Sequence, residues 1–106
     1  MTDPGRLRAR LTLETPVEVA DGAGGVVRGY AAAATLWAEV VALGARAAVV
    51  AEARGATATH RIRIRRRGDV TTRHRLRRGD RLWHIAALAD DTSGRFLLID
   101  AEERRD

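Results

Sequence analysis

The most constraining feature of this chain is a strict alternation near its middle, in residues 59–67 (Thr-His-Arg-Ile-Arg-Ile-Arg-Arg-Arg). Ile62 and Ile64 share one parity with His60. The other parity carries only arginine: Arg61, Arg63, Arg65 and Arg67. A period of two is typical of a strand with one buried and one exposed face, whereas a helix would scatter the arginines around its axis. We predict a central strand whose apolar face needs neighbouring strands to cover it.

Segments on both sides of this strand also have the pattern of strands. Residues 6–19 alternate, and Pro16 within them indicates an edge strand or a bend. The glycines of 21–25 favour a turn, and 90–94 is typical of a hairpin loop. Three further segments complete the prediction, namely a strand buried on both faces at 82–89, a last strand at 95–101, and a charged, frayed tail at 102–106.

Residues 26–43 give conflicting signals. Ala31–Ala34 are strong helix formers, whereas Thr35–Val41 contains the β-branched and aromatic residues that favour a strand. Residues 45–54, between Gly44 and Gly55, are typical of a short helix that needs packing to persist. The sequence therefore predicts a mainly β domain over residues 1–106, a small β-barrel or sandwich of about six to seven antiparallel strands with one short helix or projecting loop.

A single core should join strands that are distant in the sequence. Both tryptophans are expected in it, because lone tryptophans usually anchor a core. The predicted core residues are Trp37, Ile62, Ile64, Trp83, Ile85 and Leu98.

No set of residues has the spacing of a catalytic, cofactor or metal site. The chain has no cysteine, and its three histidines lack the spacing of metal ligands. The only serine lies in a predicted turn, and no glycine-rich phosphate loop is present. No segment approaches the ~20 apolar residues of a membrane span. These features argue against an enzyme, a cofactor and a membrane partner.

Charge is unevenly distributed along the chain. Residues 54–81 hold eleven arginines against Asp69 and Asp80, whereas residues 82–106 carry an excess of acids. One basic surface could meet an anionic partner, which makes a small nucleic-acid-binding β-barrel one hypothesis. The arginines could equally form the exposed face of strands and pair with acids of this chain or of a neighbouring copy. Asparagine and glutamine, which commonly read bases, are absent.

The order of several short motifs resembles the head–tail joining proteins of tailed phages. The resemblance covers nearly the whole chain and depends on the ordered set rather than on one motif. It consists of Gly5–Arg8, Asp21-Gly22 with Gly24-Gly25, Leu36–Val40, Thr59–Arg65, Arg75-Leu76, Gly79–Arg81, Ile85, Leu97-Leu98 and Glu102-Glu103.

This resemblance implies a strand for the Trp-Ala-Glu-Val segment and a small β-barrel for the domain. It also implies a homo-oligomeric ring, commonly a hexamer, at the neck of a phage or of a gene-transfer-agent-like particle. There a head-completion or stopper protein would lie between a portal or adaptor protein and a tail-terminator or tail protein, around packaged double-stranded DNA. A related tail-completion role is the alternative within the same assembly. Assembly would take place in the bacterial cytoplasm.

The resemblance further suggests two sets of functional residues. Segment 43–58 would project toward the ring axis and help to close the channel, although it is richer in alanine than the family pattern and has Arg46 where an acid is expected. Its candidate channel residues are Arg46, Val49, Val50, Glu52 and Arg54. The docking residues would be the arginines of the central strand meeting acids of an adjacent subunit or ring. These are Arg61, Arg63, Arg65 and Arg67, with Glu102 and Glu103 of a neighbour.

Overall fold

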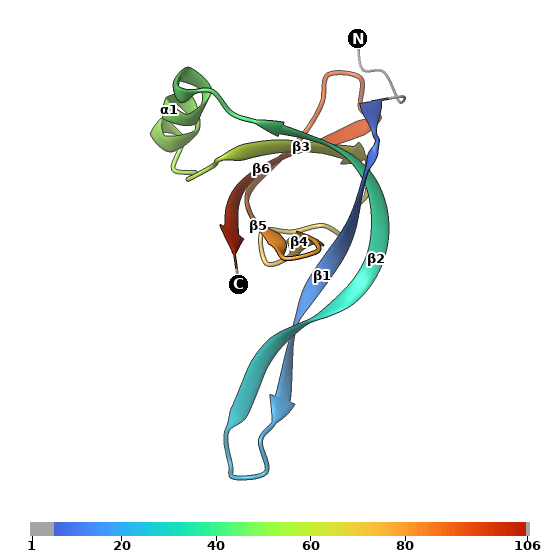
Figure 1. The fold of residues 1–106 in the computed structure, drawn as a ribbon, viewed down its shortest axis with the longest axis vertical. Coiled ribbons are helices and arrows are strands. Elements are labelled where there is room, and N and C mark those ends of the chain that lie inside the picture. The colour runs from blue at the N-terminus through green and yellow to red at the C-terminus, as the bar shows by residue number, and fades with distance from the viewer. Residues whose placement is uncertain (1–5, 106) are drawn as a thin grey trace.

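Six antiparallel strands close into a barrel in the computed structural model, which describes residues 6–105, with only the backbone of Arg105 (Figure 1). The elements in chain order are β1 (Ala9–Ala20), β2 (Val26–Ala42), α1 (Ala45–Ala53), β3 (His60–Arg65), β4 (Arg75–Arg78), β5 (Arg81–Asp90) and β6 (Phe96–Arg105). Around the barrel their order is β1-β2-β3-β6-β5-β4, and β4 pairs with β1 to close it. The prediction of a mainly β fold with one short helix is confirmed.

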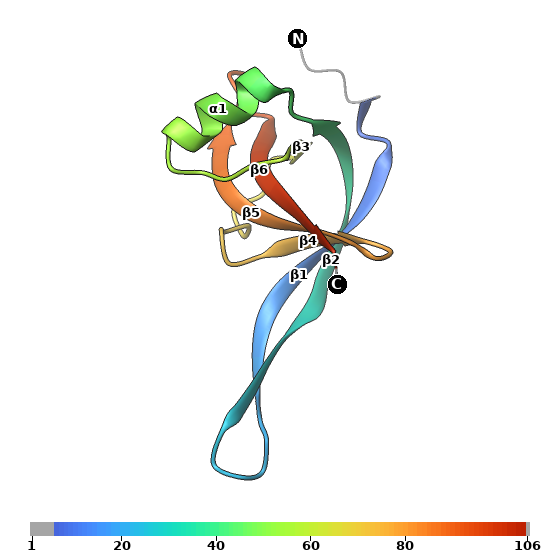
Figure 2. The ribbon, with the colours of Figure 1, turned by 60° about the vertical axis from the view of Figure 1, so that its left-hand side comes forward.

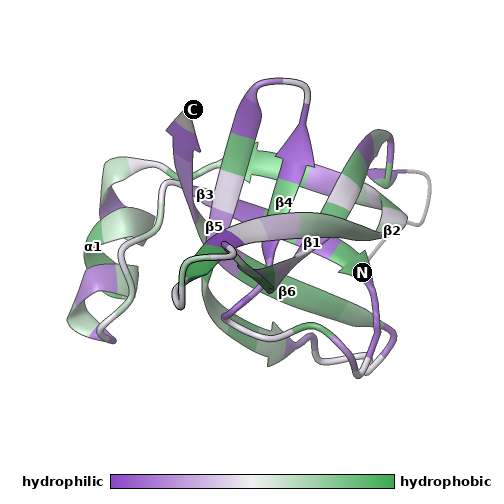
Figure 3. Cartoon of the chain, turned by 90° about the horizontal axis from the view of Figure 1, so that it is seen from below, coloured by the Kyte–Doolittle hydropathy of each residue, from purple (hydrophilic) through white to green (hydrophobic). Residues whose placement is uncertain are grey.

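The predicted central strand is β3, which pairs with β2 on one side and β6 on the other. Ile62 and Ile64 are completely buried, whereas Arg61 and Arg65 are exposed. Hydrophilic and hydrophobic residues alternate along the barrel strands in the same way (Figure 3). The period-two pattern therefore identified which face of β3 turns inward.

The conflict over residues 26–43 is resolved in favour of a strand. β2 is 17 residues long and pairs with β1 from Val26 to Ala38, and then with β3 from Ala38 to Ala42. Its alanines Ala31–Ala33 are exposed, so pairing with β1 rather than burial overrides their helix propensity. The register of β1 and β2 shifts between Leu13 and Glu14, which leaves one extra residue in β2.

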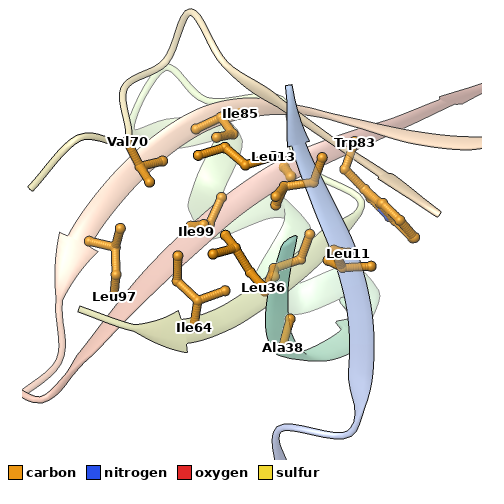
Figure 4. Close-up of a cluster of buried hydrophobic side chains, with 13 residues drawn as sticks. Leu11, Leu13, Leu36, Ala38, Ile64, Val70, Trp83, Ile85, Leu97 and Ile99 are labelled. Carbon is orange, nitrogen blue, oxygen red and sulfur yellow. The ribbon is translucent and has the colours of Figure 1, made fainter. Parts of the chain in front are cut away.

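The core fills the barrel with mostly aliphatic side chains, and Trp83 lies at one side of the cluster (Figure 4). Ile62, Ile64, Trp83 and Ile85 are buried as predicted. The prediction for Leu98 is wrong, because its neighbours Leu97 and Ile99 are the residues of β6 that face the core. The prediction for Trp37 is wrong, because this side chain is 54% exposed on the outside of the barrel. Its neighbours Leu36 and Ala38 are the buried residues, so Trp37 shares the outer face of β2 with Thr35 and Glu39.

The C-terminal segment is ordered where fraying was expected. Glu102–Arg105 continue β6 and pair with the start of β5, with Glu103 opposite Trp83. Asp106, the last residue of the predicted tail, lies outside the described residues. Pairing along β5 therefore extends the last strand beyond the apolar run that the sequence shows.

A two-stranded hairpin extends far beyond the barrel (Figures 1 and 2). We call residues 17–29 the arm: they comprise the end of β1, the turn 21–25 and the start of β2. β4 pairs with β1 only at Thr12–Glu14, so the arm has no third strand, and Pro16 lies where β1 becomes an edge. The chain measures 52 Å along its longest axis against 28 and 24 Å across it.

Candidate functional site

Segment 43–58 stands to one side of the barrel, between β2 and β3 (Figure 2). Its base is closed by a hydrogen bond of 2.9 Å from the Leu43 amide to the Thr59 carbonyl. Ala51, Ala56 and Ala58 are buried, which anchors one side of the segment. The candidate channel residues Arg46, Val49, Val50, Glu52 and Arg54 are all exposed. α1 thus presents a mixed apolar and charged face to solvent.

A pocket of about 190 Å³ separates α1 from the outer face of the barrel. Val50, Ala51 and Arg54 line it from the helix side, and Leu88, Leu98 and Asp100 line it from β5 and β6. The helix therefore rests on the barrel through small side chains rather than through a large apolar contact.

Three of the four candidate docking arginines already have carboxylate partners in this chain. Arg61 Nε donates to Asp100 Oδ1 at 2.9 Å, and Arg63 Nη1 donates to Glu39 Oε1 at 2.9 Å. Arg67 forms a bidentate pair with Asp69 at 2.9 and 2.8 Å, and that hydrogen bond lowers the pKa of Asp69 to about 2. Arg65 is exposed and has no ion pair within residues 6–105.

The acids expected to meet these arginines have other partners. Arg81 Nη2 donates to Glu103 Oε1 at 2.6 Å, and Arg104 pairs with Glu102. The structure therefore does not bring the β3 arginines together with Glu102 and Glu103 of the same chain. Pairing of Arg65 with a carboxylate of another subunit stays a prediction.

The sequence reasoning missed a patch on the outer face of β1, β2 and β3. We call Arg8, Arg10, Trp37 and Arg65 the Trp37 patch. Arg10 lies opposite Trp37 in the β1–β2 register, and its guanidinium carbon is 5.5 Å from the indole ring centre. Leu7, Arg8, Trp37 and Arg65 line a pocket of about 410 Å³. Parity could have placed Trp37 here, because it alternates with Leu36 and Ala38.

The arm was predicted only as a turn between two strands. Gly22 and Gly24 have φ values of 81° and 88°, which only glycine adopts freely. The Asp21 carboxylate accepts hydrogen bonds from the Ala23 and Gly25 amides at 2.8 and 3.0 Å, and these bonds lower its pKa. The tip is thus a well-formed turn with an ionised carboxylate at its surface.

No feature of the described residues indicates catalysis. Residues 6–105 contain no group of three or more histidine, aspartate or glutamate side chains arranged to hold a metal ion. His60 shares a hydrogen bond of 2.8 Å with the Thr59 hydroxyl, and its ring meets the Trp83 ring edge-on. Both contacts are made with residues of the fold itself. None of the helices in the part of the chain described is long and apolar enough to cross a membrane.

Comparisons with known proteins give one family match and two similar solved structures. A family model described as phage head completion protein matches residues 2–104. The solution structure of protein SF1141 from Shigella flexneri 2a is similar to this chain with 30% identity and a TM-score of 0.78, covering 96% of each chain. A chain from the virion of a native gene transfer agent particle is also 30% identical, with a TM-score of 0.63, covering 93% of this chain and 96% of that one. A search of curated proteins found no significant match.

Proposed function

The chain belongs to the phage head completion protein family, and on that premise we propose that it forms a connector ring at the neck of a phage or gene-transfer-agent particle. In this role it lies between the portal or adaptor and the tail, retains packaged DNA and provides a docking face for the tail. The ring is a homo-oligomer, with six subunits as the expected number.

The observation that carries this proposal is the placement of exposed apolar side chains. In the described part of the chain, the large exposed ones lie on the arm and the adjoining stretch of β2, on the outer face of β2, and on α1: Val19, Val26, Val27, Tyr30, Trp37, Val41, Val49 and Val50. The closed barrel itself offers no free strand edge for pairing. A small subunit with separate apolar surfaces fits a component that contacts several neighbours at once.

Retention of DNA is assigned to segment 43–58. Its exposed Val49 and Val50 can contact the same segment of other subunits around an axis, and Arg46 and Arg54 can contact DNA there without base recognition. The loose packing of α1 on the barrel supports a part that changes position between a closed and an open channel. The two ends of the segment stay fixed by the Leu43–Thr59 hydrogen bond.

The role can be tested by deleting the gene for this protein from the genome that encodes the particle. We expect heads that package DNA but leak it, so that added nuclease degrades it, and that carry no tails. Purified wild-type protein should restore both DNA retention and tail attachment. Heads that retain DNA beside free, unattached tails would instead indicate the tail-completion role. Normal, infectious or transducing particles would contradict both assignments.

A further inference from the structure

The arm has an apolar surface that nothing in its own chain covers. Val19 and Val27 are paired across the two strands and are 62% and 58% exposed, and Val26 is 54% exposed. An isolated two-stranded hairpin is marginally stable in water, and exposed apolar clusters mark contact sites. The arm therefore needs a partner that covers its valines.

The Trp37 patch is the complementary surface. It combines the most exposed aromatic ring of the described chain with the guanidinium groups of Arg8, Arg10 and Arg65. Neither Arg10 nor Arg65 has a carboxylate partner among residues 6–105. The arm contains two acids, Glu18 and Asp21, against one base, Arg28, which lies 3.2 Å from the Glu18 carboxylate, so the arm has one acid in excess. An acidic, valine-rich hairpin with a small glycine tip thus matches a basic pocket beside an indole ring.

The two surfaces cannot meet within one subunit. Both are on β1 and β2 but at opposite ends, because Val27 and Trp37 are ten residues apart along β2, or about 33 Å in a strand. A contact between arm and patch is therefore head-to-tail between two copies. A contact of this kind generates a closed ring when the rotation between copies closes, and a filament when it does not.

We propose that the arm of each subunit docks on the Trp37 patch of the next copy and that this contact builds the ring. The inference rests on the proposed function and names its subunit interface. Val19 and Val27 cover the indole ring of Trp37, while Glu18 and Asp21 approach Arg10 and Arg65. Because the arm and the Trp37 patch lie at opposite ends of one long hairpin, every copy can bind one neighbour through its arm and another through its patch.

Disulfide trapping tests the contact, because the chain has no natural cysteine. We would combine Ala23→Cys at the arm tip with Thr35→Cys beside the patch. Thr35 is nine residues along β2 from Val26, about 30 Å, far beyond the 4.4–6.8 Å between Cα atoms that a disulfide requires. Oxidation should therefore link different copies into a ladder of covalent oligomers. The matched control is Ala23→Cys alone, because a chain with a single cysteine cannot be linked beyond a dimer.

A second experiment tests the direction of the contact. Val27→Asp disables the arm and Trp37→Ala disables the patch; both side chains are exposed, so both variants should melt like the parent. In the two-cysteine background each variant alone should lose the ladder. Mixing them should give a heterodimer linked once and nothing larger, because only one arm and one patch remain intact.

The outcomes separate this interface from the proposed function. If the ladder persists in both variants, or never forms in the parent pair, the arm and the patch do not meet and the interface proposal fails. The connector role is then tested by the gene-deletion experiment on particles alone. If the variants keep the ladder but Trp37→Ala removes DNA binding, the patch contacts DNA rather than a second copy.

Discussion

Glu14 is the charged residue buried within the described chain, and it lies where the barrel closes. Its carboxylate accepts hydrogen bonds from Arg75 Nε at 2.6 Å and from Arg77 Nε at 3.1 Å. β1 and β4 are paired there at only three positions. The Glu14 side chain therefore adds two ion pairs to a short stretch of backbone pairing. Removing one partner of such a cluster leaves charges that are poorly solvated.

Replacing Glu14 with alanine should therefore destabilise the monomer by about 2–4 kcal/mol, measured as a lower midpoint in urea unfolding. The matched control is Glu18→Ala, which removes a carboxylate 3.2 Å from Arg28 on the exposed arm. That change should cost at most about 0.5 kcal/mol, because an exposed ion pair is screened by water. Equal effects of the two substitutions would show that the closing strands do not depend on the buried carboxylate.

At the scale of elements, alternation and turn residues predicted most of the strands correctly. The failures have physical reasons. Trp37 was assigned to the core by residue type, although its alternation with Leu36 and Ala38 places it outside. Glu102 and Glu103 look like a solvated tail, but pairing with β5 and the ion pair with Arg81 hold them in a strand. The arm could not be predicted, because the sequence pattern of the β1–β2 hairpin does not indicate that β4 pairs with only part of β1.

Deleting Ala45–Arg54 and joining the ends with a short Gly-Ser linker should leave the barrel folded. The β2–β3 pairing at Ala42 and His60 and the Leu43–Thr59 hydrogen bond already hold the ends together, and loop closure free energy changes slowly with length. Circular dichroism and thermal melting should resemble the parent. Particles carrying the deletion should assemble and leak DNA. Loss of folding would instead place α1 in the core.

At the scale of the molecule, the number of arginines, 19, overstates the basic surface available to an anion. Arg61, Arg63, Arg67 and Arg81 each pair with a carboxylate of the same chain, and Arg75 and Arg77 share the carboxylate of Glu14. Three further exposed arginines also pair with acids: Arg28 with Glu18, Arg66 with Asp90 and Arg104 with Glu102. This distribution favours contacts between proteins over a continuous track for nucleic acid.

The isolated monomer should accordingly bind double-stranded DNA only weakly near physiological salt, without sequence preference. Each phosphate contact adds about 0.9 to the slope of log affinity against log salt, so a slope of about 2 or less is expected. Arg65→Glu should lower that slope by about 0.9 at most, which corresponds to one phosphate contact. Arg78→Glu, at a second exposed position, should have the same small effect. Sub-micromolar affinity with a steep slope would favour the nucleic-acid-binding hypothesis.

The closing seam of the barrel also bears on the order of folding. The β1–β2 hairpin and the β4–β5–β6 meander need only local turns, whereas Glu14 and Arg75 are 61 residues apart in sequence. Contacts between distant segments form late, because closing a long loop costs entropy before any pairing offsets it. Until that step, β1 and β4 expose unpaired edges to other chains. The rate of seam closure, set against the rate of encounter between nascent chains, therefore determines whether synthesis yields soluble subunits or aggregates.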